Sequence, residues 1–137
     1  MIRRTLGLLA LSGLLVSLGA CSEPPYTNID NVQLKTLLAQ GTPLYDVRRP
    51  EEWRQTGVVA GSRKLTFVDA SGRMNPQFLP SFGAEVDKTA PVILICRTGS
   101  RTKALAHELA GQGYTRIYNV QNGITRWVGE NNPVVHN

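Results

Sequence analysis

The sequence predicts an α/β domain built on a mostly parallel β-sheet with helices on both faces. Three observations predict it. Short apolar segments alternate with helix-forming segments from residue 43 to the end of the 137-residue chain. The segment Val92–Ile95 is apolar without alternation, as is typical of a strand covered on both faces. Repeats and low-complexity stretches do not interrupt this order, and the length suits one domain rather than two.

The first expected element of the domain is a helix over residues 31–40. Asp30 or Asn28 supplies the side chain that caps its N-terminus. Gly41 and Pro43 follow its last turn and end it.

A strand, a short helix and a second strand are expected next. Residues 43–47 are mainly apolar and short, as in a buried strand. Pro50 is favoured at the first position of a helix, and two glutamates follow it in the first turn, where negative charge is favourable. Residues 62–68 form the second strand candidate.

The second half of the chain continues the alternation. The expected elements are a helix interrupted by proline and glycine over 75–86, a buried strand over 91–96, a helix over 100–111, a strand over 115–120 and a short helix over 122–131. Parallel strands separated by helices bring their carboxyl ends to one edge of the sheet, and ligands bind there.

Residues 1–20 are expected to be a secretion signal rather than a part of the domain. Two arginines are followed by a Leu-rich stretch of sixteen residues and by small residues before Cys21. A membrane-spanning anchor is the alternative. The apolar stretch is shorter than the roughly 20 residues that a spanning helix needs, and glycines interrupt it.

The segment "LGAC", residues 18–21, resembles the lipobox of bacterial lipoproteins. The resemblance implies that Cys21 is lipidated, becomes the first residue of the mature chain and holds it on a membrane at roughly 0.8 kcal/mol per buried methylene. We therefore expect an exported lipoprotein facing the periplasm. Its parts would be a signal peptide over 1–20, a lipid-anchored linker over 21–29 and a single domain over 30–137.

The charge of the chain is weak evidence for nucleic acid, because a small anionic ligand fits it equally well. Lys and Arg number 15 against 10 Asp and Glu, and two of the arginines lie in residues 1–20, so the remainder carries a net charge of +3. The chain has no dense basic run with interleaved aromatic residues, and nucleic acid is therefore not an expected partner.

The chain has two cysteines, Cys21 and Cys96, and this small number limits its redox and metal chemistry. If lipidation uses Cys21, Cys96 has no partner for an internal disulfide. Two cysteines cannot form a tetrahedral cysteine site for zinc. An unpaired thiol in an oxidising compartment is either buried and inert or used chemically.

Cys96 stands where a parallel sheet binds ligands, directly after a strand and before a helix. The helix that begins near Ser100 offers its positive dipole end, and Gly99 lets the loop turn its backbone N–H groups toward the sulfur. Arg97 and Arg101 add charges that suit an oxyanion. The sequence thus predicts a thiolate, open to solvent, at the centre of an anion-binding loop.

The loop "CRTGSR", residues 96–101, resembles the active-site loop of the rhodanese family, sulfurtransferases that carry sulfur as a cysteine persulfide. Three more segments resemble the family in the same order: "DVRRPEEW", "TGVVAGSRKL" and "NVQNGITRWVGENNPV". The similarity extends from about residue 31 to residue 134. Val58 stands where the family commonly has a histidine, and Asn122 where it often has a glycine.

The resemblance implies a rhodanese-like fold and transfer of sulfur through a persulfide on Cys96. The thiolate would attack the sulfane sulfur of thiosulfate or a similar donor, and the sulfur would then pass to a thiophilic acceptor such as a thiol or cyanide. This mechanism implies neither a metal nor an organic cofactor. The residues expected to bind the donor are those of the loop: Arg97, Thr98, Gly99, Ser100 and Arg101.

Asp46 and Arg48 are expected to support the site rather than to react. Asp46 would accept hydrogen bonds from the loop, and Arg48 would pair with Glu51 or Glu52. We expect no general base, because His107 lies on the outer face of its helix and the only other histidine is in the tail.

Three alternatives compete with this enzyme. The domain could hold sulfur or sense redox state through Cys96 for a protein partner, with little turnover. It could be a cysteine phosphatase or an arsenate reductase, but the related phosphatases have a loop one residue longer. Cys96 could also be an inert, buried thiol, since free cysteine is among the most buried residues.

Overall fold

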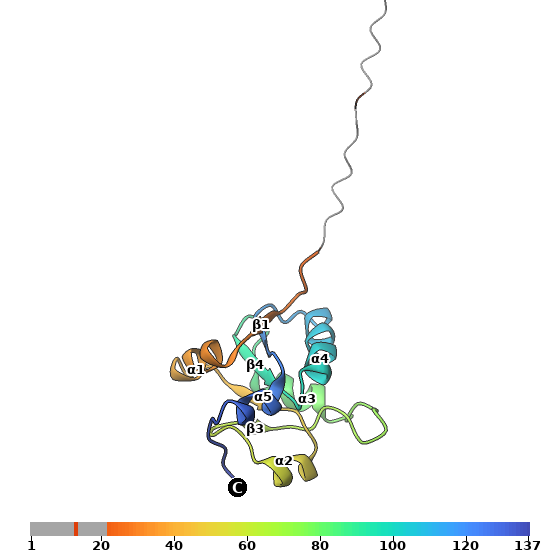
Figure 1. Cartoon of the computed structure of the whole chain (residues 1–137). Helices are drawn as coiled ribbons and strands as arrows, with labels where there is room; N and C mark the ends of the chain where they lie inside the picture. Colours follow the sequence, from red (N-terminus) through yellow and green to blue (C-terminus); the bar gives the residue numbers. More distant parts are fainter. Residues whose placement is uncertain (1–12, 14–21) are drawn as a thin grey trace, which may run out of the picture.

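The computed structural model describes residue 13 and residues 22–137, and it shows an α/β domain around a five-stranded sheet (Figure 1). The strands are β1 (Thr27–Ile29), β2 (Leu44–Asp46), β3 (Arg63–Lys64), β4 (Val92–Ile95) and β5 (Ile117–Val120). The helices are α1 (Asn31–Ala39), α2 (Pro50–Thr56), α3 (Phe78–Glu85), α4 (Ser100–Gly111) and α5 (Gly123–Gly129). The strand order is β1-β5-β4-β2-β3, and every pairing is parallel.

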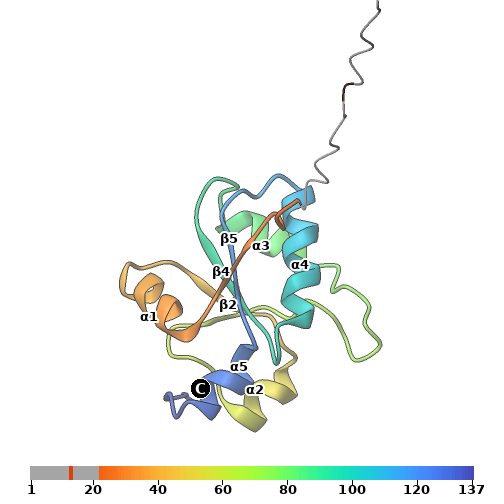
Figure 2. The same cartoon turned by 45° about the horizontal axis from the view of Figure 1, so that its top comes forward.

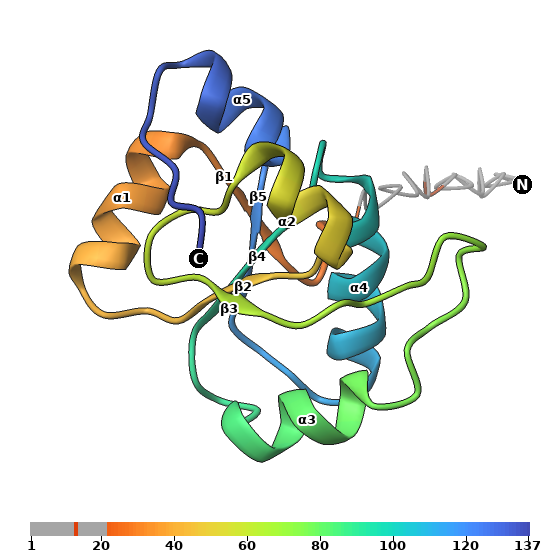
Figure 3. The same ribbon diagram turned by 90° about the horizontal axis from the view of Figure 1, so that it is seen from below.

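Helices cover both faces of the sheet, as the sequence predicts. One hydrophobic cluster joins the sheet to α3 and α4, and the other joins it to α1 and α5. Figures 2 and 3 show these two helix pairs on opposite sides of the strands, with α2 beside α5 at one end of the sheet.

The central strand β4 explains why the sheet needs two helical layers. Val92 and Leu94 belong to the cluster of α3 and α4, while Ile93 and Ile95 belong to the cluster of α1 and α5. All four side chains are fully buried. Successive side chains of a strand point to opposite faces, so an apolar run without alternation is stable only between two layers.

Local signals place the helix ends close to their expected positions. Asp30 caps α1, accepting a hydrogen bond from the backbone N–H of Gln33, whose side chain accepts one in return. Pro50 opens α2. Pro80 lies in the first turn of α3, where its missing N–H would have had no helical partner.

The structure differs from the sequence-based expectation at two strands. Residues 27–29, expected to be part of the linker, form the edge strand β1, whose residues pair with Tyr118, Asn119 and Val120 of β5. Of the three, only Ile29 is buried, so backbone pairing rather than an apolar pattern defines this strand. Likewise β3 comprises two residues of the expected 62–68. The sheet therefore begins at Thr27, three residues before the expected start of the domain.

The predicted signal peptide, apart from residue 13, and the predicted lipidation site Cys21 lie outside the described residues. Within the part of the chain that the structure does describe, no helix combines the length and the apolar character needed to cross a membrane.

Because all the strands are parallel, their N-terminal ends lie along one edge of the sheet and their carboxyl ends lie along the opposite edge, and neither of these is the edge formed by the strand β1 or β3. The described N-terminal segment enters β1 at the edge where the strands begin, and α2 lies at the other edge, where the strands end (Figure 1). Cys96 follows the last residue of β4 and therefore lies at this carboxyl edge.

Helix α5 holds the segment after β4 in place. The backbone N–H of Ile124 donates to the carbonyl of Cys96 at 2.9 Å, and that of Thr125 donates to the carbonyl of Arg97 at 3.1 Å. These N–H groups belong to the first turn of α5, where no helical acceptor exists. Gly123 makes the approach possible, because a Cβ there would lie 2.4 Å from the carbonyl oxygen of Cys96.

Gly123→Ala is expected to lower the free energy of unfolding by about 2 kcal/mol or more, because the added methyl would overlap the backbone of Cys96 and Arg97 and because the φ angle is positive. Urea denaturation followed by tryptophan fluorescence measures the effect. The matched control is Gly129→Ala in the same helix, where a Cβ would meet nothing within 4 Å. Equal stability of the two variants would contradict the role assigned to Gly123.

Candidate active site at the carboxyl edge of the sheet

The sulfur of Cys96 is surrounded by groups of its own loop and of α4. The backbone N–H of Gly99 donates to Sγ at 3.2 Å, and the hydroxyl of Thr102 lies 3.4 Å from it. The loop thus turns a main-chain amide toward the sulfur, as its sequence predicts. Cys96 itself is only 1% exposed, so the expectation of a sulfur open to solvent is wrong for this conformation.

Gly99 gives the loop its curl. Its φ angle is +101°, in the region that favours glycine, and it is the residue that caps α4. Four of the five residues predicted to bind the sulfur donor differ in their exposure to solvent. Gly99 is buried and bonded to the sulfur, whereas Arg97, Thr98 and Ser100 are exposed.

Arg101 is bound by a carboxylate from α2. Its guanidinium donates to both oxygens of Glu52, at 2.7 and 2.6 Å, in the forked geometry that suits a carboxylate. The side chain of Glu52 is only 5% exposed. Burial by itself would raise the pKa of this carboxyl, but hydrogen bonds from Arg101 and from the backbone of Arg49, together with their charges, lower it to about 2.

Arg97 is the more available of the two loop arginines. Its side chain is 60% exposed, and its Nε lies 3.8 Å from Oε1 of Glu52, beyond hydrogen-bond distance. It borders a hollow of about 240 Å³ between α2 and α5, together with Gln55, Thr125 and Val128. A small anion at this edge of the sheet would meet Arg97 before Arg101.

Asp46 and Arg48 support the site in a different way from the one expected. They form a buried pair at 2.8 Å, and the pairing of Arg48 with a glutamate side chain does not occur. Arg48 also donates to the carbonyl of Gly57 at 2.7 Å. Asp46 accepts from the indole N–H of Trp53 at 3.0 Å, which fixes α2 against the end of β2.

Sequence reasoning missed three polar residues at the site: Glu52 and Thr102, which contact the loop, and Asn119, which contacts Thr102. The sequence predicts Glu52 in the first turn of its helix and as a partner of Arg48, and it predicts Thr102 and Asn119 simply as parts of the helix over 100–111 and the strand over 115–120. A signal for Glu52 exists, since it lies in the segment "DVRRPEEW" used for the family resemblance. Asn119 likewise is the first residue of the segment "NVQNGITRWVGENNPV". Thr102 is an uncharged residue of a regular helix, and a single sequence gives it no distinguishing pattern.

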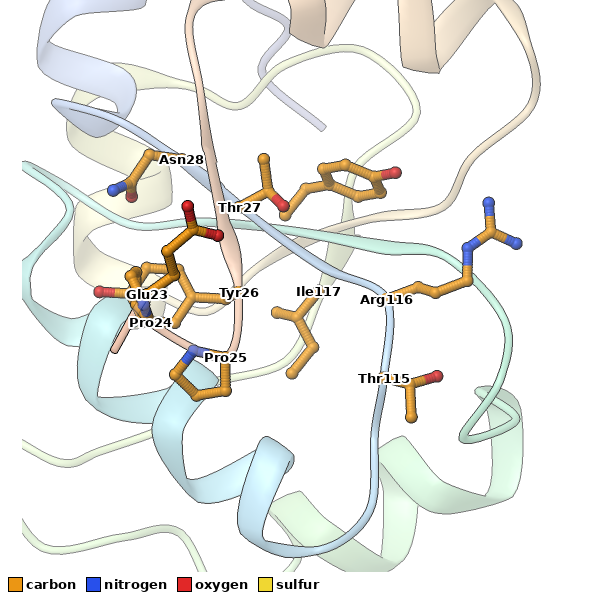
Figure 4. Close-up of a pocket in the computed structure, with 10 residues that line it drawn as sticks. Glu23, Pro24, Pro25, Tyr26, Thr27, Asn28, Thr115, Arg116 and Ile117 are labelled. Carbon is orange, nitrogen blue, oxygen red and sulfur yellow. The ribbon is translucent and has the colours of Figure 1, made fainter. Parts of the chain in front are cut away.

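A second hollow lies at the other end of the strands, away from Cys96. It has a volume of about 630 Å³ and lies between the segment before β1 and the start of β5 (Figure 4). Arg116 and Glu23 are among the residues that line it. Since these residues precede the strands, the hollow is at the edge of the sheet opposite to Cys96.

Among residues 13 and 22–137, no cluster of three or more His, Cys, Asp and Glu side chains is placed to hold a metal ion. His107 is exposed, as expected, and its ring contacts that of Tyr26. It lies on the outer side of α4, so it is not placed to act on Cys96.

Comparison with known proteins finds sulfurtransferases among the relatives of this chain. A thiosulfate sulfurtransferase GlpE from Ectopseudomonas mendocina is 28% identical over 102 residues, which cover 74% of this chain and 84% of that protein. A sulfurtransferase from Allochromatium vinosum is 29% identical over 109 residues, 78% of this chain and 92% of that protein.

The fold is shared with solved structures as well. The crystal structure of a rhodanese-related protein from Thermoplasma volcanium matches with a TM-score of 0.62 and 26% identity, over 82% of this chain and all of that one. The model of the rhodanese-like domain matches residues 30–130, which include every element from α1 to α5. The chain therefore belongs to the rhodanese-like domain family, which includes sulfurtransferases.

Proposed function

We propose that the chain is a sulfurtransferase that takes sulfane sulfur from thiosulfate or a similar anionic donor and passes it to a thiol or to cyanide. The Cys96 thiolate attacks the outer sulfur of the donor, the S–S bond of thiosulfate breaks, and sulfite leaves with the electron pair. The acceptor then attacks the outer sulfur of the persulfide, and the Cys96 thiolate is restored.

The hydrogen bond from the Gly99 N–H to Sγ of Cys96 is the observation that carries this proposal. A hydrogen-bond donor held at this position stabilises negative charge on the sulfur of Cys96 and, after sulfur transfer, on the persulfide. The relatives named as thiosulfate sulfurtransferases suggest the donor.

The loop arginines have separate roles in the proposed reaction. Arg97 is free enough to bind the oxyanion of the donor and to stabilise the departing sulfite. Arg101 is already bonded to Glu52 by both ends of its guanidinium, so it holds the first turn of α4 to α2. Because Cys96 is buried, the donor reaches the sulfur only when the exposed part of the loop, Arg97 and Thr98, moves aside.

Cys96→Ser is expected to abolish thiosulfate-dependent sulfur transfer to cyanide, because the serine hydroxyl cannot form the persulfide. The thiocyanate produced measures turnover, and the control is Cys21→Ser, which leaves the proposed nucleophile in place. Most of the activity remaining in Cys96→Ser would contradict the proposal. A stable persulfide on the unaltered chain without turnover would indicate a sulfur carrier instead.

Glu52→Gln is expected to lower the free energy of unfolding by roughly 3 kcal/mol near neutral pH. The pKa of Glu52 is about 2 in the folded chain, whereas its ordinary value is 4.5. The contribution of the ionised carboxylate to the free energy of unfolding is therefore complete above pH 4.5 and is lost as the pH falls toward 2. Urea denaturation at neutral and at acidic pH measures both effects.

Glu51→Gln is the matched control, because the neighbouring Glu51 is half exposed and pairs with Arg49 at the surface. The unaltered chain and this control should lose stability between pH 4.5 and 2, whereas Glu52→Gln should lose much less over that interval. Parallel losses in all three chains would show that Glu52 is not the group responsible.

We also propose that the chain is exported and anchored to a membrane by lipid on Cys21, facing the periplasm. The sequence around Cys21 suggests this anchor. The linker after Cys21 would then join the domain at the edge of the sheet where the strands begin, opposite to Cys96. The site would face away from the membrane. Mass spectrometry of the mature chain should find acyl groups on an N-terminal Cys21, and a mature chain that retains residues 1–20 would contradict the anchor.

A further inference from the structure

A chain of buried polar groups links the Cys96 sulfur to the edge strand β1. The hydroxyl of Thr102 lies 3.4 Å from Sγ and 2.5 Å from Oδ1 of Asn119. The Nδ2 group of Asn119 donates to Oδ1 of Asn28 at 2.9 Å. Thr102 and Asn119 are both 0% exposed, so water does not substitute for a missing partner.

The bond to Asn28 fixes the orientation of the Asn119 amide. Because Nδ2 points to Asn28, the carbonyl oxygen Oδ1 points to Thr102 and can only accept a hydrogen bond. The hydroxyl of Thr102 has one proton, and three acceptors surround it: Asn119 Oδ1, the carbonyl of Gly99 at 3.1 Å, and Sγ of Cys96. Asn119 makes the shortest of these contacts.

The protonation state of Cys96 decides where this proton lies. Either atom can donate in the contact between Sγ and Oγ1, so while Cys96 is a thiol its S–H can donate to Oγ1 of Thr102 as the Thr102 hydroxyl donates to Oδ1 of Asn119. Once the thiol proton leaves to solvent, the sulfur is an acceptor with full negative charge. The Thr102 hydroxyl then turns toward the sulfur, and the buried Oδ1 of Asn119 loses its donor.

We propose that Thr102 is a positioning residue whose single hydroxyl proton is contested by the Cys96 sulfur and by Asn119, and that this competition sets how readily the thiol ionises. Thr102 favours the thiolate and Asn119 opposes it. The inference deepens the proposed function, since sulfur transfer needs the thiolate, but the competition itself concerns only the resting chain.

The charged groups that lie at the loop are Arg97 on the loop itself, Arg101 at the start of α4, Glu52 on α2, and the buried pair of Asp46 at the end of β2 and Arg48 after it. The other charged residues of α3, α4 and α5 are exposed: Glu85, Lys103, His107, Glu108 and Arg126. The strands β4 and β5 have no charged residue. Substitutions at Thr102 and Asn119 leave all of these charges unchanged. A shift in the pKa of Cys96 in such variants therefore reports on the hydroxyl and the amide.

The test is a pH titration of the Cys96 thiolate by its ultraviolet absorbance, with the Cys96→Ser chain subtracted to remove the signal of Cys21. Thr102→Val should decrease the thiolate fraction at a given pH about tenfold, because the sulfur loses a donor. Asn119→Leu should increase that fraction about threefold, because the hydroxyl is released to the sulfur. Thr102→Ser keeps the hydroxyl and should titrate like the unaltered chain.

Shifts of opposite sign in Thr102→Val and Asn119→Leu, with Thr102→Ser unchanged, support the proposal, and any other pattern overturns it. If a buried variant does not fold, Asn28→Ala replaces it, since Asn28 is exposed and orients the Asn119 amide. Its thiolate fraction must also rise, and an unchanged titration overturns the proposal. The titration needs no sulfur donor and is therefore independent of the sulfur-transfer assay. If the titrations show the expected shifts but the chain transfers no sulfur, the proposed sulfurtransferase function is wrong and the role of Thr102 stands.

Discussion

The site depends on a closed set of backbone hydrogen bonds that keeps the loop after β4 curled around its own sulfur. The Gly99 N–H points inward to Sγ, while the carbonyls of Cys96 and Arg97 point outward to the first N–H groups of α5. A loop whose carbonyls turned inward would repel negative charge on the sulfur. An anion-stabilising site therefore requires the close packing of Gly123 against the loop, although Gly123 is 27 positions after Cys96 in the sequence.

Two polar environments meet at this loop. On the side of α2, the ionised Glu52 binds Arg101 and leaves Arg97 as the exposed cation, so the positive charge that a donor meets is smaller and more local than two free arginines would give. On the side of β5, uncharged groups, Thr102 and Asn119, contact the sulfur directly or through one another. The charged environment beside α2 affects the binding of an anion, and the uncharged environment beside β5 affects the protonation state of Cys96.

Most of the fold could be predicted from the sequence, because local signals define it. The apolar run of β4 required two helical layers, and the bounds of α4 agree with those expected from its sequence. The edge strand β1 could not be predicted, since it is defined by pairing with β5 far along the chain. At the site, Cys96 and Gly99 have the expected places, but the partners of Arg48 and Arg101 depend on how α2 packs at the loop. The burial of the sulfur depends on the hydrophobic cluster of α3 and α4, to which Cys96 belongs.

The central claim is that the curled loop lets Cys96 carry a sulfur atom. Intact-protein mass spectrometry before and after incubation with thiosulfate tests it most directly. The account predicts a mass gain of one sulfur atom on the unaltered chain, located on Cys96 and removed by a thiol reductant. A chain that gains no sulfur, or gains it at another residue, would contradict the account.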